Sequence, residues 1–193
     1  DYVIGIKKNG MAALAGSALV KAATGEISSD AELGSAEMHF EVTGTVEYLA
    51  EDDAHGIEIA RDVVKSLSWN STKTVASVPT IPPKYDIKEI LGLVSTDYRK
   101  PYDVKELIAR LVDNSSFIEF KPNYGTSTVC IQTQIFGVAC GVIGNNGPID
   151  PNGATKAAQF FQLCDHANNP IIFLNNTTGC LLYTSDAADE RRC

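Results

Sequence analysis

The chain has 193 residues, of which 44% are hydrophobic and 21% are charged. These proportions are typical of a folded protein and argue against a disordered chain. The formal net charge is −8, and the basic residues form no cluster, which disfavours binding to nucleic acid or to an anionic membrane surface. No apolar run approaches the ~20 residues that a membrane-spanning helix needs.

The five cysteines are odd in number and include no CxxC pair. This pattern argues against a zinc ribbon and against a disulfide framework. The sequence starts without a secretory leader and without an initiator methionine, as if a strand were already under way. We therefore expect a reducing compartment of the cytosolic type.

The first part of the chain is expected to open with a strand at residues 2–6. Residues 11–23 are small and apolar, with Gly16 and Ser17 in their middle. Such a stretch permits close approach of a backbone or of a ligand, and a tightly packed junction between a strand and a helix is the plainer interpretation. Residues 24–44 are rich in Gly, Ser, Glu and Thr and are predicted to be a loop.

His39 lies in this predicted loop, between two apolar residues. A lone histidine with no catalytic partner nearby is more often packed or hydrogen-bonded than catalytic. The residue alone therefore predicts no chemistry.

A helix is predicted to begin at Asp52 or Asp53, because a carboxylate there caps free N–H groups and complements the helix dipole. Its expected buried face has helical spacing and consists of Ile57, Ala60, Val64 and Leu67. The acidic residues 51–53 could also be interpreted as metal ligands, but no other ligand cluster lies near them in the sequence.

Residues 68–83 contain three prolines and mark a linker at which we place a domain boundary. A short helix is predicted over residues 86–91. Asp103 is positioned to cap a clearer helix. The apolar face expected for that helix consists of Val104, Leu107, Ile108, Leu111 and Val112.

The last part of the chain predicts strands at residues 129–135 and 138–143, joined by a turn at Phe136 and Gly137. A helix over residues 155–167 follows, with Ala158, Phe161, Leu163 and Cys164 among its apolar positions. Residues 171–174 predict a buried strand of the parallel-sheet type. In such a strand–helix–strand unit, ligands bind at the carboxyl ends of the strands. The expected site edges are therefore residues 144–147 and 177–179.

Several motifs of known chemistry are absent from the sequence, namely GxSxG, HExxH and the dinucleotide fingerprint. Cys164 and His166 are two residues apart on a predicted helix, so they cannot pair with each other. The residues alone predict an α/β protein with a site made of backbone groups in glycine-containing loops, and they name no substrate.

Several stretches taken together resemble the carboxyltransferase (β) subunit of biotin-dependent acyl-CoA carboxylases, across residues 1–179. They are residues 15–26, 34–39, 43–44, 48–53, 102–110, 117–121, 124–125, 141–147 and 173–179. The resemblance is nearest to the methylcrotonoyl-CoA and geranyl-CoA carboxylase branch. There the chain reads Asn175-Asn176-Thr177-Thr178-Gly179, where propionyl-CoA-type relatives carry Asp-x-Pro-Gly.

The resemblance implies a crotonase-like (ββα spiral) fold and a fragment of a two-domain subunit. Residues 1–72 would end the N-terminal domain, which binds acyl-CoA, and residues 73–101 would be the linker. Residues 102–179 would begin the C-terminal domain, which binds carboxybiotin. Residues 180–193 depart from the family pattern and resemble a translated sequencing adapter, so we expect them to be foreign.

The resemblance also assigns site residues by position. Backbone groups of Thr178 and Gly179 would be catalytic, since aimed N–H groups stabilise the oxyanions of this reaction. The residues expected to contact biotin are Asn145, Asn146 and Gly147. The residues expected to contact acyl-CoA are Gly16, Ser17 and His39. No metal is implied. The sequence has Thr43 where the family usually has Ser.

The implied cofactor is carboxybiotin, carried on a partner subunit, and the implied substrate is a coenzyme A thioester. The implied partners are a biotin-carboxylase and biotin-carrier α subunit and further β subunits in a hexamer, in the bacterial cytoplasm or the mitochondrial matrix. The fragment alone is expected to be inactive. Two alternatives stay open: the carboxyltransferase of a biotin-dependent decarboxylase, and a non-catalytic crotonase-like scaffold.

Overall fold

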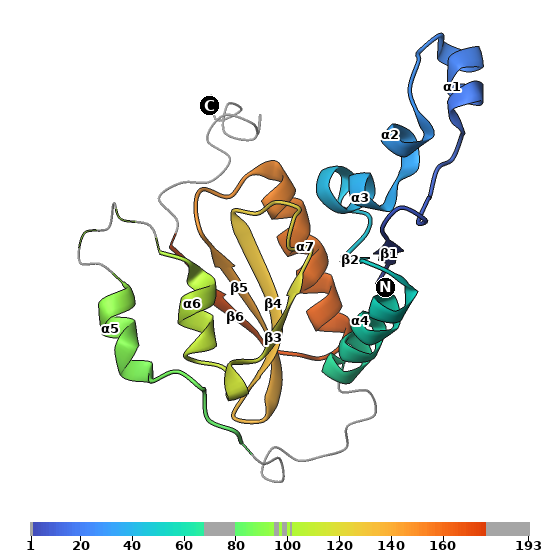
Figure 1. The fold of residues 1–193 in the computed structure, drawn as a ribbon. Coiled ribbons are helices and arrows are strands. Elements are labelled where there is room, and N and C mark those ends of the chain that lie inside the picture. Colours follow the sequence, from blue (N-terminus) through green and yellow to red (C-terminus); the bar gives the residue numbers. More distant parts are fainter. Residues whose placement is uncertain (1, 68–79, 95–96, 98–99, 101, 177–193) are drawn as a thin grey trace. The chain divides into compact units, whose positions relative to one another are not determined.

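The computed structural model describes residues 2–67, 80–94, 97, 100 and 102–176. The chain forms two compact units. Unit 1 comprises Asp1–Trp69 together with the short segment Lys121–Tyr124, and unit 2 comprises Asn70–Phe120 and Gly125–Cys193. Secondary structure is mixed α and β in both units (Figure 1), which confirms the α/β class at that level.

Unit 1 contains a parallel pair of short strands, β1 (Ile4–Ile6) and β2 (Tyr48–Ala50), with Ile4 opposite Tyr48. Helix α4 (Asp53–Ser66) contacts both strands. Asp52 is its N-cap, and the carboxylate accepts a hydrogen bond from the His55 N–H at 2.8 Å. The predicted helix start is therefore confirmed.

The predicted buried face of α4 is wrong by about one position. Ile57 and Val64 are each 63% exposed, whereas Gly56 and Val63 are buried. Gly56 faces the strands, because a Cβ there would lie 2.8 Å from Ile6 Cδ1. A glycine carries no hydrophobic signal, so the sequence pattern could not indicate that the helix makes its closest approach at this residue.

The loop predicted over residues 24–44 is also wrong, because most of this stretch is helical. It contains the end of α1 (Ser17–Thr24), then α2 (Asp30–Gly34), α3 (Ala36–Met38) and the π-helix η1 (His39–Thr43). In Figure 1, α1 and α2 form an arm that extends away from β1 and β2. Ser29 and Glu32 make a reciprocal capping box at the start of α2, a local signal that overrides the polar composition.

Unit 2 is built on a four-stranded sheet in the order β3-β4-β5-β6 (Figure 1). The strands are β3 (Phe117–Phe120), β4 (Thr128–Ile135), β5 (Val138–Asn145) and β6 (Ile171–Leu174). The β3–β4 and β4–β5 pairs are antiparallel, and β5 and β6 are parallel. The predicted hairpin and the strand–helix–strand unit are confirmed, while β3 is an additional strand.

Strand β6 differs from its prediction in burial. Ile172 is 38% and Phe173 55% exposed in the described part of the chain. The strand has one hydrogen-bonded neighbour there, β5, so it lies at the edge of the sheet. A continuous apolar run predicts burial on both faces, and the described elements cover this strand only partly.

The main hydrophobic core of unit 2 lies between the sheet and helix α6 (Val104–Ala109). Asp103 caps this helix, and its carboxylate accepts a hydrogen bond from Lys105 N–H at 3.0 Å. The predicted face is confirmed at its centre. The cluster of buried residues consists of Val104, Ile108, Val112, Val129, Ile131 and Val142. The 3₁₀ helix η3 (Ile87–Glu89) and the short α-helix α5 (Ile90–Leu93) precede α6, and a second 3₁₀ helix, η4 (Asp113–Ser115), follows it.

Helix α7 (Pro151–His166) packs on β4 and β5. The ring of Phe160 lies 5.6 Å from that of Phe120, whose strand partner is Cys130. Side chains alternate between the faces of a strand, so α7 covers the face opposite to the Val129–Ile131 side.

The bounds and face predicted for α7 need correction. The helix begins at Pro151 with Asp150 as its N-cap. Ala158 and Phe161 are exposed, and the buried positions are Gly153, Lys156, Phe160 and Cys164. Proline is favoured in the first helical turn, which explains the early start. The absence of a side chain at Gly141 admits Phe160 and Cys164 to the sheet.

Candidate functional site

The carboxyl ends of β5 and β6 are joined by the side chain of Asn145. Its Nδ2 donates hydrogen bonds to the Gly147 carbonyl at 2.9 Å and to the Asn176 carbonyl at 2.8 Å. Its Oδ1 accepts from the Asn176 N–H at 2.9 Å. The residue is only 2% exposed, so its amide fixes the point at which the chain leaves β6.

Asn146 connects the same loop to the start of α6. Its Oδ1 accepts a hydrogen bond from the Val104 N–H at 2.8 Å, and its Nδ2 donates to the Asp103 carboxylate at 3.1 Å. Its backbone N–H donates to the Ser127 carbonyl at 2.8 Å. The N-terminus of a helix leaves N–H groups without partners, and Asn146 satisfies one of them.

Gly147 is the most open of the three residues assigned to biotin. It is partly exposed, and a Cβ added to it would meet nothing nearer than Ser127 Cβ at 4.0 Å. Asn145, Asn146 and Gly147 thus form one continuous edge at the end of β5. Thr178 and Gly179, the predicted catalytic residues, lie outside the described residues.

Gly16 and Ser17, assigned to acyl-CoA, stand at the start of α1. Gly16 is the N-cap, with an extended backbone and no side-chain cap. The Ser17 N–H donates to Asp30 Oδ1 at 2.7 Å. This hydrogen bond lowers the pKa of the exposed Asp30 carboxyl. The carboxylate therefore ties α1 to the start of α2.

His39, the third residue assigned to acyl-CoA, uses both ring nitrogens within unit 1. Its Nε2 lies 2.7 Å from the Ala12 carbonyl oxygen, and its Nδ1 lies 2.9 Å from Thr43 Oγ1 and 3.0 Å from Thr45 Oγ1. A carbonyl oxygen only accepts, so Nε2 carries the proton and donates. None of the hydrogen bonds between described residues joins His39 to Gly16 or Ser17; the ring instead anchors the segment that leads to them.

The π-helix η1, which carries His39 and Thr43, ends at a buried cluster that the sequence did not predict. Gly44 caps the helix in a left-handed conformation, with φ +65°. Lys121 Nζ donates to the Gly44 carbonyl and lies 3.3 Å from Glu47 Oε1. Both charged side chains are nearly inaccessible, with 4% and 3% exposure. The sequence signal for this pair is weak, a lysine directly after the strand Phe117–Phe120.

The buried thiols of unit 2 are held in the protonated form. Burial raises the pKa of Cys130 to about 12 and those of Cys140 and Cys164 to about 11. The thiolate is the reactive form of cysteine, so these side chains are poor nucleophiles at neutral pH.

Lys156 is a fully buried cation on the inner face of α7. Its Nζ has no hydrogen-bond partner among the described residues, and desolvation lowers its pKa. An unpaired buried ammonium is unfavourable, so the residue is a source of instability in unit 2.

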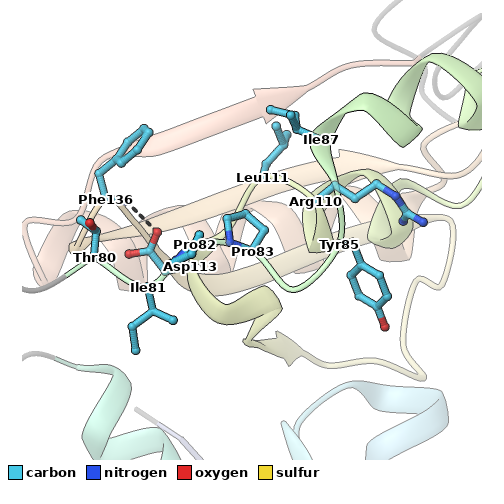
Figure 2. Close-up of a pocket in the computed structure, with 10 residues that line it drawn as sticks. All are labelled: Thr80, Ile81, Pro82, Pro83, Tyr85, Ile87, Arg110, Leu111, Asp113 and Phe136. Atoms are coloured by element: carbon cyan, nitrogen blue, oxygen red, sulfur yellow. Dashed lines mark hydrogen bonds between the residues drawn. The ribbon is translucent and has the colours of Figure 1, made fainter.

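A pocket of about 370 Å³ in unit 2 lies away from these residues. Figure 2 shows Phe136 at the turn between β4 and β5, with a dashed hydrogen bond to the Asp113 carboxylate. The lining residues are Thr80, Ile81, Pro82, Pro83, Tyr85, Ile87, Arg110, Leu111, Asp113 and Phe136. None of the residues assigned to acyl-CoA or biotin lines this pocket.

The described residues also lack two further features. They contain no group of three or more His, Cys, Asp or Glu residues that could hold a metal ion. Their helices are all too short or too polar to cross a membrane.

The chain belongs to the carboxyl transferase domain family, whose profile matches residues 1–190. The chain is 42% identical over 183 residues to a probable biotin-dependent acyl-coenzyme A carboxylase β2 subunit of Mycobacterium tuberculosis, covering 94% of this chain and 34% of the relative. It is 39% identical over 182 residues to the mitochondrial methylcrotonoyl-CoA carboxylase β chain of Dictyostelium discoideum, covering 94% and 31%. The chain thus spans about a third of the length of these relatives.

Comparison with solved structures leads to the same family. The β subunit of geranyl-CoA carboxylase from P. aeruginosa is 48% identical, with a TM-score of 0.54, covering 95% of this chain and 34% of that one. The transcarboxylase 12S hexamer with hydrolysed methylmalonyl-coenzyme A is 32% identical, with a TM-score of 0.83, covering 94% and 36%. The resemblance found in the sequence is therefore confirmed at the level of the family and of its acyl-CoA carboxylase β subunits.

Proposed function

We propose that this chain is part of a carboxyltransferase subunit that transfers a carboxyl group from carboxybiotin to an acyl-CoA. The fold would be the crotonase-like ββα spiral, with residues 1–72 ending the acyl-CoA domain, 73–101 linking, and 102–179 beginning the carboxybiotin domain. Residues 180–193 are proposed to be foreign. The family match runs to residue 190, so it includes part of that segment, whose origin stays a prediction.

The observation that carries the proposal is the pair of hydrogen bonds between Asn145 and Asn176. Asn176, the last described residue, is thereby held in place, and Thr178 and Gly179 follow it in the sequence by two and three residues. Backbone N–H groups aimed at a developing oxyanion lower the barrier of acyl and carboxyl transfer by several kcal/mol. We assign this role to the N–H groups of Thr178 and Gly179.

Biotin fits the open side of the same loop. Gly147 has space where a Cβ would stand, and its carbonyl is oriented by Asn145. Biotin, when bound, supplies the carboxyl group. Of the residues assigned to it, Gly147 would supply the contact surface, whereas Asn145 and Asn146 would hold the loop through their amides.

Acyl-CoA is proposed to bind in unit 1 near Gly16, Ser17 and His39. The backbone is open beside Gly16, where a Cβ would meet only Asp30 Oδ1, at 3.6 Å. His39 would act by fixing Ala12, four residues before Gly16, rather than through a free ring nitrogen. The proposed acyl group is of the methylcrotonoyl or geranyl class, which the relatives of these names and residues 175–179 support.

The proposed assembly is a hexamer of β subunits together with an α subunit that carries biotin. The solved transcarboxylase 12S is a hexamer, which supports the proposed hexamer. The α subunit is proposed because the relatives are biotin-dependent carboxylases. The proposed location is the bacterial cytoplasm or the mitochondrial matrix, since relatives come from bacteria and mitochondria.

The test begins with the complete reading frame that contains this sequence, expressed with its biotin-carrying partner. Transfer of labelled carboxyl from bicarbonate is measured with methylcrotonoyl-CoA, geranyl-CoA and propionyl-CoA. We expect the branched or long unsaturated thioesters to be carboxylated. Decarboxylation without carboxylation would favour the decarboxylase alternative, and assembly with no turnover would favour the scaffold.

One substitution addresses the biotin loop directly. Gly147→Val places a side chain in open space without a clash inside the protein, so the variant should fold and the apparent KM for the biotin-carrying partner should rise. Gly92→Val is the matched control, because a Cβ at Gly92 also meets nothing within 4 Å. Equal KM values for the two variants would contradict the assignment of Gly147.

A further inference from the structure

The segment Lys121–Tyr124 lies in the sequence between β3 and β4 of unit 2 but belongs to unit 1. Lys121 adopts a left-handed conformation, with φ +49°, and its ammonium group contacts the Gly44 carbonyl and Glu47. The other oxygen of the Glu47 carboxylate, Oε2, accepts a hydrogen bond from the Val3 N–H at 2.6 Å. One buried cation thus connects the end of η1 to the residue that precedes β1.

Tyr124 also contacts Gly44. A Cβ on Gly44 would lie 2.7 Å from Tyr124 Cδ1, so the ring rests directly on the glycine backbone. The Gly44 N–H in turn bonds the His39 carbonyl, which is the hydrogen bond that completes the π turn. A π turn inside a helical segment is uncommon and is often found at functional sites.

His39 depends on this turn for its ring partners. Thr43, at the end of η1, and Thr45, just after Gly44, supply the two hydroxyl groups at Nδ1. Displacing Gly44 would move both hydroxyls away from the ring. The Nε2 donor would then lose its fixed direction toward the Ala12 carbonyl.

We propose that Lys121 is a positioning residue for the acyl-CoA site, because it holds the end of the π turn that orients His39. This inference rests on the proposed function for the assignment of His39 to acyl-CoA. Lys121 has no role in the chemistry itself. It neutralises Glu47 and supplies the donor that the buried Gly44 carbonyl requires, since an unpaired buried carbonyl is unfavourable.

The test uses four variants of the complete subunit. Lys121→Met removes the cation, and Lys121→Arg keeps it as the conservative rescue. The double variant Glu47→Gln with Lys121→Met removes both charges and keeps an acceptor for Val3. Lys7→Met is the matched control, because it breaks the solvent-exposed ion pair with Glu51 in the same unit.

Three readouts are measured: hydrogen exchange of the peptide that covers residues 39–46, the steady-state constants for acyl-CoA, and the midpoint of urea unfolding. In Lys121→Met we expect faster exchange of the Gly44 and Thr45 amides. We also expect a KM for acyl-CoA raised by about tenfold with kcat little changed, which is the signature of binding lost equally from the ground state and the transition state. Lys121→Arg should restore most of both. Lys7→Met should leave both as in the unsubstituted protein.

The double variant separates positioning from stability. Removing both members of a buried ion pair destabilises far less than removing one, so the urea midpoint should recover while KM stays high. Recovery of midpoint and KM together would mean a purely structural pair and would overturn the inference. Unchanged exchange in Lys121→Met would overturn it as well. Faster exchange with an unchanged KM would show that Lys121 holds the π turn but that His39 does not serve acyl-CoA binding. That result would overturn the assignment of His39 in the proposed function.

Discussion

Asn145 and Asn176 exchange two hydrogen bonds, one from Nδ2 to the Asn176 carbonyl and one from the Asn176 N–H to Oδ1. The parallel ladder between β5 and β6 ends at Gly144 and Leu174. The side-chain amide has the same donor and acceptor as a peptide group, so it extends the ladder beyond its last backbone pair. The chain just after the end of β6 is therefore held by the Asn145 side chain and not by strand pairing.

This relationship predicts different outcomes for two substitutions of Asn145. Asn145→Asp keeps the acceptor for Asn176 but brings a buried carboxylate against the Gly147 and Asn176 carbonyls, and Asn145→Ala removes all three hydrogen bonds. We expect each variant to lose about 1–3 kcal/mol of unfolding free energy in urea, since buried partners are left unsatisfied, with Asp the more destabilising at neutral pH. Asn169→Ala is the control, because Asn169 bonds Cys164 through its backbone. Equal stability of Asn145→Ala and the control would contradict the prediction.

Lys156→Met should stabilise the protein at pH 7. The ammonium is buried without a partner among the described residues, and methionine has a similar length and no polar atom. Unpaired burial of a polar group costs about 1–3 kcal/mol in proteins, and the urea-unfolding free energy should rise by a comparable amount. A loss of stability would show that Lys156 has a partner elsewhere.

The destabilising effect of Lys156 should depend on pH. Desolvation lowers the pKa of Lys156 from an ordinary value of 10.5, so the unfolded chain binds this proton more tightly than the native one. Native stability therefore rises with pH from the lowered pKa up to 10.5. The advantage of the Met variant should shrink as pH rises through this window. An advantage that is constant with pH would argue against the lowered pKa.

Cys130→Val should flatten the alkaline limb of the stability profile. Burial raises the pKa of Cys130 from 9.0 to about 12, so above pH 9 the native state holds a proton that the unfolded chain releases. The stabilisation is complete below pH 9 and is lost as pH rises toward 12. Unfolding free energies between pH 8 and pH 11 of both proteins would show a smaller slope in the variant; parallel slopes would contradict the prediction.

We expect the chain to self-associate when it is expressed alone, because apolar side chains in and beside α1 are exposed. No residue of α1 is buried, and Leu14, Leu19 and Ile27 are 107%, 61% and 83% exposed. Large apolar side chains exposed in this way favour association. Light scattering after size exclusion should show oligomers or aggregates, reduced in a variant with Leu14→Ser, Leu19→Lys and Ile27→Thr. If the unsubstituted chain were monomeric, the result would contradict this expectation.

Local signals allowed much of unit 2 to be predicted from the sequence. Asp103 before an apolar helical pattern predicted α6 because the cap and the buried face lie within ten residues of one another. Alternation predicted β4, a continuous apolar run predicted β5, and the end of that run indicated Asn145, Asn146 and Gly147 as a loop at the sheet edge. These features depend on neighbours in the chain, which the sequence displays directly.

The partners of these residues could not be predicted, because they come from distant parts of the chain. His39 meets Ala12 and the hydroxyls of a π turn, and Lys121 meets Gly44 and Glu47. The inner face of α4 was missed because Gly56, and not an apolar side chain, makes the close approach. Tertiary packing decided each of these cases over local pattern.

The place of Lys121–Tyr124 in unit 1 means that the chain cannot be divided at its proline-rich linker into two self-sufficient parts. A cut there would leave Glu47 buried without its cation and the Gly44 backbone without the Tyr124 ring. The N-terminal piece would then keep every residue that precedes the linker but lose the contacts that Lys121 and Tyr124 supply. Any genetic dissection of this protein must therefore keep residues on both sides of the linker to preserve the surroundings of His39.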